Sequence, residues 1–389
     1  MACFDVVIVG AGPAGSTAAR ELAQGGARVC LVDKARFPRP KACGGALSPR
    51  VLRYLPPGAD RLIRARIQRA VFTFRSGRSF EVKSAVPMGF MMCREEFDMW
   101  LRVIAEEAGA CVREGMAVRR IERAGAQFAV HASGEVLRAS WVIGADGANS
   151  LVGAQLFPRR VPAKLIGLEA ELPWGEGGLE GTVLIDVGRT PGGYAWAFPK
   201  GDHVNVGVML DLSRGRKLRE TLNTFLRGVP GVAADVGVRG QIAPIAAPSG
   251  PAPPCAEGAA LLVGDAARLA DPFLGEGIYY AIKSGSLAAN AVLSGRNAED
   301  AEFRYETAIA EGIRADLRAA SRLATVFHKA PRWWHRILSQ MPGSLMGYVA
   351  VLAGEDSYTG LLKHLVEQLG SRAGKSFLPR LGLVQSGAS

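Results

Sequence analysis

A short apolar run that ends in a glycine-rich turn constrains the fold of this chain more than any other feature. Residues 6–9 read Val-Val-Ile-Val, and Gly10, Gly12 and Gly15 follow with the spacing Gly-x-Gly-x-x-Gly. Such a run predicts a buried parallel strand, a sharp turn and a helix whose N-terminus can hold a pyrophosphate. In this pattern Gly10 makes the turn, Gly12 lets the backbone approach the phosphates, and Gly15 lets the helix pack closely.

An acidic residue at the expected distance supports a dinucleotide site. The predicted helix 16–24 is followed by an apolar run, 28–32, that ends in Asp33 and Lys34. Asp33 lies about 20 residues beyond the glycines, where a carboxylate accepts hydrogen bonds from ribose hydroxyls.

A second motif, about 250 residues later, indicates which dinucleotide is bound. Residues 259–263 form another predicted buried strand, and Gly264 and Asp265 follow it directly. Gly275 and Gly277 then open a predicted helix that includes Ile278. In flavoproteins this arrangement holds the ribityl chain and the flavin ring, so the pair of motifs indicates FAD.

Composition and charge exclude several classes of protein. The chain has 389 residues, of which 48% are hydrophobic, enough for a core divided over two or three lobes. Its six cysteines show neither a Cys-x-x-Cys pair nor metal-ligand spacing, so we expect free thiols, no metal and a cytoplasmic location. We expect no signal peptide and no membrane span. The net charge of +11 fits a solvated basic surface or an anionic lipid surface, whereas scattered Lys and Arg without a known motif argue against nucleic acid.

The predicted fold class is α/β, with a Rossmann-like FAD-binding domain, an antiparallel β-sheet substrate domain and a helical C-terminal region. The substrate domain is inferred from short alternating strands between about residues 163 and 238. The predicted division is 1–70, 94–160 and 241–300 for the discontinuous FAD-binding domain, 71–93 and 161–240 for the substrate domain, and 301–389 for the C-terminal region.

Together with Gly144-Ala-Asp-Gly147, these motifs resemble the p-hydroxybenzoate-hydroxylase-like flavoproteins, and three segments resemble the geranylgeranyl reductases among them. The segments are Lys41-Ala-Cys-Gly-Gly-Ala-Leu-Ser48, Pro191-Gly-Gly-Tyr-Ala-Trp-Ala-Phe-Pro-Lys200 and Asp271-Pro-Phe-Leu-Gly-Glu-Gly-Ile-Tyr-Tyr-Ala-Ile282. The resemblance covers roughly residues 4–300. Two departures stand out: Ala46 replaces a usual third glycine, and Arg268 stands where aromatic hydroxylases carry histidine.

The resemblance implies a set of residues around FAD. Arg94 can offer its guanidinium to pyrophosphate or ribityl oxygens, and the amides of Gly277 and Ile278 can stabilise negative charge on a reduced flavin. The thiol of Cys43 is the candidate catalytic group: it can donate a proton, hydrogen-bond the flavin or shape the pocket, and a small buried apolar residue is the plain alternative. The full cofactor-binding set is Gly10, Gly12, Ala14, Gly15, Asp33, Lys34, Cys43, Gly44, Arg94, Val118, Asp265, Gly275, Gly277 and Ile278.

The resemblance also implies a substrate. Tyr194, Trp196 and Phe198 alternate, so they face one side of a strand, where they wall an apolar cavity or pack in an ordinary core. The implied reaction is hydride transfer from flavin N5 to one carbon of an isolated alkene, with a proton added to the other. A polyprenyl chain suits such a groove, with a lipid, diphosphate, quinone or chlorophyll-type head group. The electron donor is NAD(P)H or a ferredoxin-like carrier protein.

Other functions remain open at this stage. The run Tyr194-Ala-Trp-Ala-Phe-Pro199 approaches the Trp-x-Trp-x-Ile-Pro segment of halogenases, so the main rival is a monooxygenase or halogenase that acts through a flavin C4a-hydroperoxide. A redox-inactive lipid carrier is the third reading. Residues 329–338 mix tryptophans with basic residues, which suits peripheral contact with a membrane or a core or lid helix.

Overall fold

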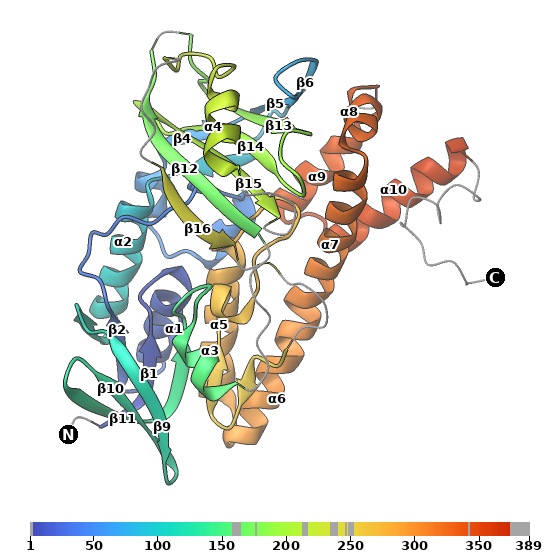
Figure 1. The fold of residues 1–389 in the computed structure, drawn as a ribbon. Coiled ribbons are helices and arrows are strands. Elements are labelled where there is room, and N and C mark those ends of the chain that lie inside the picture. Colours follow the sequence, from blue (N-terminus) through green and yellow to red (C-terminus); the bar gives the residue numbers. More distant parts are fainter. Residues whose placement is uncertain are drawn as a thin grey trace.

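The computed structural model describes residues 3–157, 165–175, 177–211, 217–233, 240–245, 247, 253–340 and 343–373. Two large sheets lie at opposite ends of this part of the chain, and helices from the C-terminal third run beside both of them (Figure 1). The arrangement confirms the predicted α/β class with a second sheet.

The first lobe is built on an eight-stranded sheet with a parallel centre in the order β18-β11-β1-β2-β8. Its central strand β1 is fully apolar from Val6 to Val9 because both faces of the sheet are buried. The strands are β1 (Cys3–Val9), β2 (Val29–Asp33), β8 (Cys111–Glu114), β9 (Val118–Ala124), β10 (Gln127–Ala132), β11 (Glu135–Gly144), β17 (Ala256–Glu257) and β18 (Ala260–Leu262).

Helices α1 and α5 pack against each other beside this sheet (Figure 1). Gly285 of α5 allows their close approach, since a Cβ there would lie 2.3 Å from the Ala14 carbonyl oxygen. The helices of the lobe are α1 (Pro13–Gln24), α2 (Arg94–Glu107), α3 (Leu151–Leu156) and α5 (Ile278–Ser294), with the 3-10 helices η1 (Pro49–Tyr54), η2 (Ala59–Leu62) and η3 (Gly264–Ala267).

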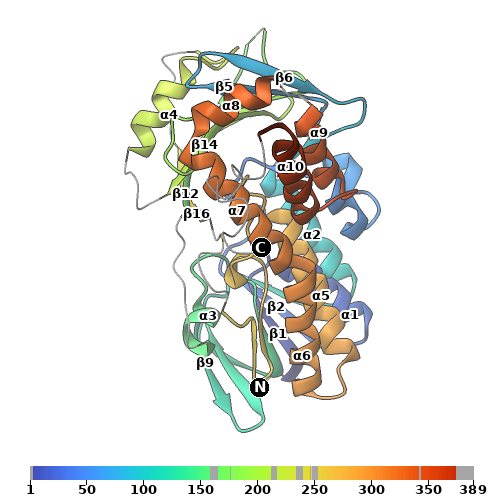
Figure 2. The same ribbon diagram turned by 90° about the vertical axis from the view of Figure 1, so that its right-hand side faces the viewer.

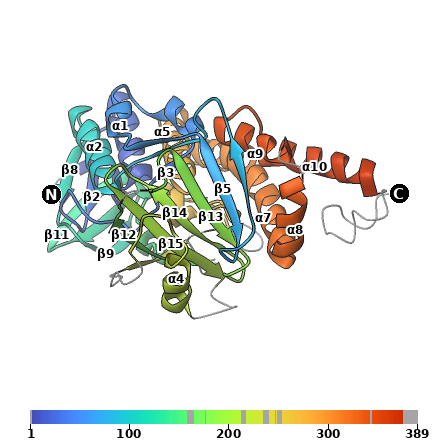
Figure 3. The same ribbon diagram turned by 90° about the horizontal axis from the view of Figure 1, so that it is seen from above.

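The second lobe is a seven-stranded sheet, mostly antiparallel, in the order β16-β12-β15-β14-β13-β5-β6. Side chains along each strand point alternately to the two faces of the sheet. On β14, Ala195 and Ala197 pack with helix α4 on the far face, which is turned away from the first lobe. The alternate residues of β14, such as Trp196, lie on the near face. Figure 3 shows this sheet from above, with α4 beside it. The elements are β5 (Arg69–Phe74), β6 (Ser79–Lys83), β12 (Leu165–Pro173), β13 (Thr182–Val187), β14 (Tyr194–Pro199), β15 (His203–Asp211), β16 (Gln241–Ile245) and α4 (Leu218–Leu226).

One part of the predicted domain division is wrong. The predicted division places residues 241–245 in the FAD-binding domain, but β16 pairs with β12 from Gln241 to Ile245 and forms an edge of the second sheet. A single edge strand carries no clear alternation that would have revealed its partner. A three-stranded sheet accompanies the large ones and consists of β3 (Ala46–Leu47), β7 (Gly89–Met91) and β4 (Ala65–Ile67).

The C-terminal region is helical, as predicted, through residue 373, and residues 374–389 lie outside the described part. A π-helical turn at 310–314 separates two α-helices of this region. Figure 2 shows α8 lying across β5 and β6. The helices are α6 (Ala298–Ile309), the π turn η4 (Ala310–Arg314), α7 (Ala315–Lys329), α8 (Pro331–Gln340), α9 (Gly343–Ala353) and α10 (Tyr358–Ala373).

The two tryptophans of α8 pack in the hydrophobic core of this helical region. Trp334 is 2% exposed and stacks on Phe327 with ring centroids 4.7 Å apart, and Trp333 packs against the same cluster. The reading of this segment as a core helix is therefore correct for Trp334. Within the described residues, no helix combines the length and the apolar character needed to cross a membrane.

Candidate active site

A cavity of about 1190 Å³ lies between the two lobes. Sites for one small molecule typically measure about 300–1,000 Å³, so this cavity has room for a large cofactor and part of a second ligand. It collects residues from the glycine turn, β2, the Cys43 loop, α2, the near face of the second sheet, the start of α5 and α9. The predicted residues that line it are Gly10, Gly12, Ala14, Asp33, Lys34, Cys43, Gly44, Arg94, Val118, Tyr194, Trp196, Phe198, Asp265, Gly275, Gly277 and Ile278.

The glycine turn presents its backbone to the cavity. Gly10 has a φ of +105°, and a Cβ on Gly15 would lie 1.9 Å from the Gly10 carbonyl oxygen, so Gly15 serves helix packing and does not line the cavity. A Cβ on Gly12 would meet only a guanidinium nitrogen of Arg39, at 3.7 Å, and would otherwise point into open space. Helix α1 starts at Pro13 with no side-chain cap and no acidic residue in its first turn, so its N-terminus suits an anion.

Two half-buried aspartates lie at this end of the cavity. The Asp33 carboxylate accepts hydrogen bonds from the Ala11 and Ala35 amides, both at 2.8 Å, which fixes its orientation at the cavity edge. Asp265 begins η3, and burial raises the pKa of its carboxyl, although the positive charges of Lys41 and Arg94 act in the opposite direction. The turn, the two carboxylates and the α1 N-terminus fit the ribose, pyrophosphate and ribityl groups of FAD.

Arg94 is held in place by an ion pair. Its guanidinium donates two hydrogen bonds of 2.9 Å to Asp98, which is fully buried and also lies 3.2 Å from Arg39. Burial opposes the charge on Arg94, but Asp98 and Cys43 outweigh it and raise the pKa of the guanidinium. Arg94 therefore presents a fixed positive charge to the cavity.

The Cys43 loop is clamped between the two lobes. The Cys43 amide donates to a carboxylate oxygen of Glu169 on β12, and the Gly45 amide donates to Cys43 Sγ at 3.5 Å. Gly45 has a φ of +72°, and a Cβ there would lie 2.1 Å from the Met92 carbonyl oxygen. Ala46, where the family usually has glycine, lies in β3 with ordinary strand pairing to Met91, so its side chain is accommodated.

The three predicted aromatics form a row on the near face of β14. Tyr194 and Trp196 have ring centroids 5.8 Å apart, and Trp196 and Phe198 have centroids 6.1 Å apart. Trp196 Nε1 donates to Asn205 Oδ1 at 2.7 Å. Gly207 lies opposite Trp196 on β15, and a Cβ there would come within 2.1 Å of the indole, so the glycine makes room for the ring.

Sequence reasoning missed two parts of the site. Glu169 lines the cavity from β12, and burial raises the pKa of its carboxyl to about 7. An ionisable residue at an inward position of an alternating strand was the available signal. Helix α9 forms a wall with Leu345, Tyr348, Val349 and Leu352, and no short motif marks it.

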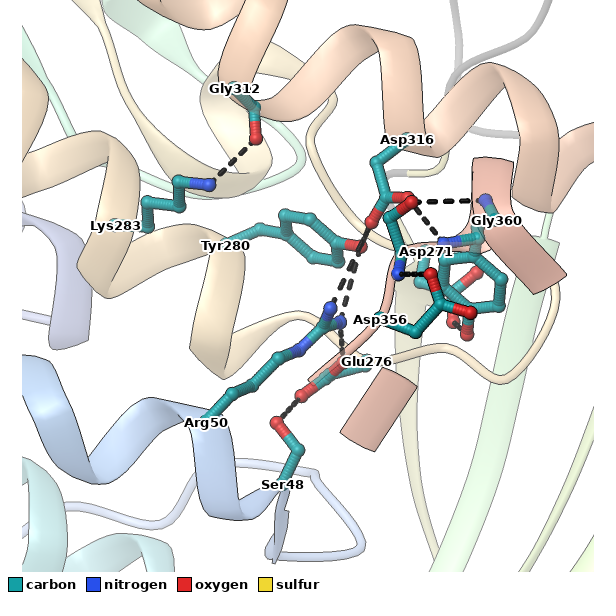
Figure 4. Close-up of polar contacts among 12 residues, drawn as sticks. Ser48, Arg50, Asp271, Glu276, Tyr280, Lys283, Gly312, Asp316, Asp356 and Gly360 are labelled. Carbon is teal, nitrogen blue, oxygen red and sulfur yellow. Dashed lines mark hydrogen bonds and ion pairs between the residues drawn. The ribbon is translucent and has the colours of Figure 1, made fainter. Parts of the chain in front are cut away.

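A buried polar cluster supports the segment before α5. Arg50 donates to Glu276 at 2.5 Å, and Ser48 donates to the same carboxylate (Figure 4). The Arg50 guanidinium also lies 3.8 Å from Asp316 of α7 and 3.2 Å from the Tyr280 hydroxyl. Because Glu276 lies between Gly275 and Gly277, the cluster fixes the backbone that opens toward the cavity.

The same polar cluster connects to helices α7 and α10. The Tyr358 amide donates to Asp316 at 2.6 Å, and the Tyr358 hydroxyl donates to Asp271 at 2.6 Å. Burial raises the pKa of Asp271 to about 6, although the Tyr358 hydrogen bond acts in the opposite direction. Helices α7 and α10 are thus joined to the site by buried polar contacts.

The Rossmann-like lobe, its glycine turn and the shared cavity define an FAD-dependent oxidoreductase. Residues 3–181 match the family model described as FAD binding domain. The chain is 35% identical to digeranylgeranylglycerophospholipid reductase 1 of Methanopyrus kandleri, over 82% of this chain and 90% of that protein. It is 36% identical to geranylgeranyl diphosphate reductase of Rhodobacter capsulatus, over 75% of each chain. The chain belongs to the geranylgeranyl reductase family.

A solved structure shares the fold. A geranylgeranyl bacteriochlorophyll reductase-like protein from Thermoplasma acidophilum matches with a TM-score of 0.77 and 24% identity, over 99% of this chain and 100% of that one. This likeness supports the two-lobed architecture, in agreement with the expected fold class.

Proposed function

We propose that this protein reduces carbon–carbon double bonds of a polyprenyl chain. The observation that carries the proposal is a single cavity with two kinds of lining: backbone amides and carboxylates at the glycine turn, and aromatic and aliphatic side chains at β14 and α9. The first kind suits FAD and the second suits a hydrocarbon chain. The names of the two relatives given above, which refer to geranylgeranyl groups, support the same substrate class.

The protein's part in this reaction is placement and exclusion of water. The α1 N-terminus, Asp33 and Asp265 would hold FAD, and the amides at the start of α5 would stabilise negative charge beside it. When bound and reduced, FAD supplies a hydride to one alkene carbon. An isolated alkene has no carbonyl to polarise, so the apolar wall must hold it in position and keep the site dry.

The reaction needs an electron donor for the flavin and a substrate that carries the prenyl chain. Either NAD(P)H or a ferredoxin-like carrier protein supplies electrons, and the substrate head group is a lipid, a diphosphate, a quinone or a chlorophyll-type ring. Basic residues at the cavity edge, among them Lys34, Lys41 and Arg119, suit an anionic head group or donor. A lipid-linked substrate would also place the protein at a membrane surface, in peripheral contact.

Mass spectrometry of lipids extracted from the purified protein, followed by turnover with the identified prenyl species, tests the proposal. We expect products heavier by two hydrogens per reduced bond. Aerobic stopped-flow of the reduced enzyme distinguishes the rival classes, because a monooxygenase or halogenase forms a flavin hydroperoxide that absorbs in the near ultraviolet. A hydroperoxide without alkene reduction would contradict the proposal, and a bound prenyl lipid that is never reduced would indicate a carrier.

Replacing Cys43 by alanine should leave FAD binding intact and slow alkene reduction. The glycines shape the loop, and its link to β12 uses the Cys43 backbone amide, which alanine retains. The thiol lies beside Arg94 in the cavity wall, where it can act on bound ligands. Flavin absorbance and single-turnover rates measure the two effects. Cys111→Ala, at an exposed position of β8, is the control. If Cys43→Ala reduced the alkene as fast as wild type, the Cys43 side chain would serve only in packing.

Replacing Trp196 by alanine should weaken binding of long prenyl substrates by about tenfold or more, because the variant loses the apolar contact of the indole and about 1.4 kcal/mol corresponds to tenfold in affinity. Flavin reduction by dithionite should be unchanged. Affinities across isoprenoids of increasing length measure the effect. Trp174→Ala, beside the far-face cluster, controls for general loss of packing. If wild type and Trp196→Ala bound isoprenoids of every length with equal affinity, Trp196 would be a packing residue of the core and not part of the substrate site.

A further inference from the structure

Glu169 brings an acidic group to the middle of the cavity. It lies on the near face of β12, opposite Gly207 of β15, which in turn lies opposite Trp196 of β14. Gly207 has no side chain, so the indole extends over it toward the strand that carries Glu169. The Glu169 residue is 9% exposed, lines the cavity and accepts the hydrogen bond from the Cys43 amide. Its carboxyl therefore lies between the Cys43 loop and the aromatic row.

The charged groups that act on Glu169 come from three elements. Arg94 reaches the cavity from α2, Lys200 follows β14, and Glu171 lies two residues further along β12. The Lys200 ammonium is 2% exposed, lies 2.5 Å from a Glu171 oxygen, and passes within 3.1 Å of a Cβ placed on Gly45. Lys200 and Glu169 thus both contact the Cys43–Gly45 segment.

This group of charges has a route to solvent. The Glu171 side chain is 46% exposed, and one of its oxygens lies 3.5 Å from the His203 ring. Solvent can therefore reach the Glu171 carboxylate, which pairs with the buried Lys200. The cavity face of Glu169, by contrast, adjoins aromatic and aliphatic side chains.

Burial raises the pKa of Glu169 to about 7, and the nearby Glu171 acts in the same direction. The Cys43 amide and the charges of Lys200 and Arg94 act in the opposite direction without cancelling the effect. A carboxyl with an ordinary pKa near 4.3 would be ionised at neutral pH, whereas this one exists in both forms. A general acid works best when its pKa lies near the working pH.

We propose that Glu169 is the acid that gives the alkene its proton. This inference rests on the proposed alkene reduction. The O–H bond of the Glu169 carboxyl breaks, its proton forms a C–H bond with one alkene carbon, and the hydride supplied by reduced flavin forms a C–H bond with the other. The π electrons of the alkene form the bond to the proton, the flavin is oxidised, and the Glu169 carboxylate regains a proton from solvent.

Three other groups in the wall that could carry a proton have hydrogen-bond or ion-pair partners of their own. The Tyr194 hydroxyl donates to the Leu274 carbonyl, and burial raises its pKa further above the ordinary value. Glu276 is paired with Arg50. Cys43 Sγ accepts a hydrogen bond from the Gly45 amide.

Single-turnover reduction of a prenyl substrate by dithionite-reduced enzyme, measured across pH, tests the role in catalysis. Glu169→Gln keeps an oxygen for the Cys43 amide but has no acidic proton, so its rate should fall about 100-fold or more. The wild-type rate should decline as pH rises through 7, Glu169→Asp should retain a pH-dependent rate, and Glu169→Gln should show no such decline. Glu81→Gln, on the outer strand β6, is the control. A Glu169→Gln rate within about threefold of wild type would overturn the proposal.

Infrared difference titration of the resting protein gives a second result that does not depend on turnover. We expect a protonated carboxyl band that disappears as pH rises through 7 and that is missing from Glu169→Gln. The absence of that band in wild type would overturn the proposal even if prenyl reduction is observed. If wild type shows the band and reduces no prenyl alkene, it is the proposed function that fails.

Discussion

Replacing Gly12 by valine should give a folded protein that is colourless after purification. The structure shows open cavity beside Gly12, so the new side chain meets no backbone and the lobe can still form. The same side chain would occupy the space beside the α1 N-terminus, where the pyrophosphate must lie. Circular dichroism should match wild type, while flavin absorbance per protein should be lost. Full FAD occupancy in this variant would defeat the cofactor assignment.

Gly15→Val provides the contrast. Its Cβ would lie 1.9 Å from the Gly10 carbonyl oxygen, so backbone atoms must move and the contact between β1 and α1 is lost. We expect this variant to be unfolded or insoluble. Asp265→Ala should fold and retain FAD weakly, because it removes one half-buried carboxylate from the cavity wall and leaves the glycine turn intact.

Replacing Arg50 by alanine should lower the free energy of unfolding by about 3–5 kcal/mol, the range found when one partner of a buried ion pair is removed. The change leaves Glu276 without its cationic partner while both side chains are at most 10% exposed. It also removes a cation over the Tyr279 ring, 4.0 Å from its centroid. Denaturant titration of the apoprotein measures the effect.

Arg53→Ala is the matched control for this prediction. Arg53 lies in the same 3-10 helix but is exposed, and its hydrogen bond to the Ala353 carbonyl is long at 3.4 Å. We expect a change below about 0.5 kcal/mol. If Arg50→Ala were equally mild, the buried cluster would contribute nothing to stability.

The parts of the fold that the sequence predicted are those controlled by local chemistry. The turn after β1 requires a positive φ, which Gly10 adopts easily. The apolar run from Val6 to Val9 fits a strand that is buried on both faces of the sheet. The alternation of Tyr194, Trp196 and Phe198 likewise predicted their shared face, because side chains in a strand point alternately to its two sides.

The parts that the sequence did not predict depend on contacts between distant residues. Glu169 meets the Cys43 amide across 126 positions, and neither neighbourhood contains a sign of the other. Strand β16 joins the second sheet by pairing with β12. The π turn at 310–314 contains one glycine, Gly312, and a single glycine does not distinguish such a turn from an α-helix. The α9 wall was missed because an apolar helix has the same composition whether it faces a cavity or a solid core.

The residues that form the α9 wall lie far in the sequence from those that form the glycine turn. The glycine turn that suits FAD is encoded within the first 15 residues, whereas Leu345, Val349 and Leu352 are encoded some 330 residues later. Changes in the size of these three side chains alter the volume of the cavity at its α9 wall and leave the glycine turn unchanged. Under the proposed function, a lineage can therefore adjust the length of prenyl chain that the cavity accepts by small changes in α9, while the cofactor end stays the same.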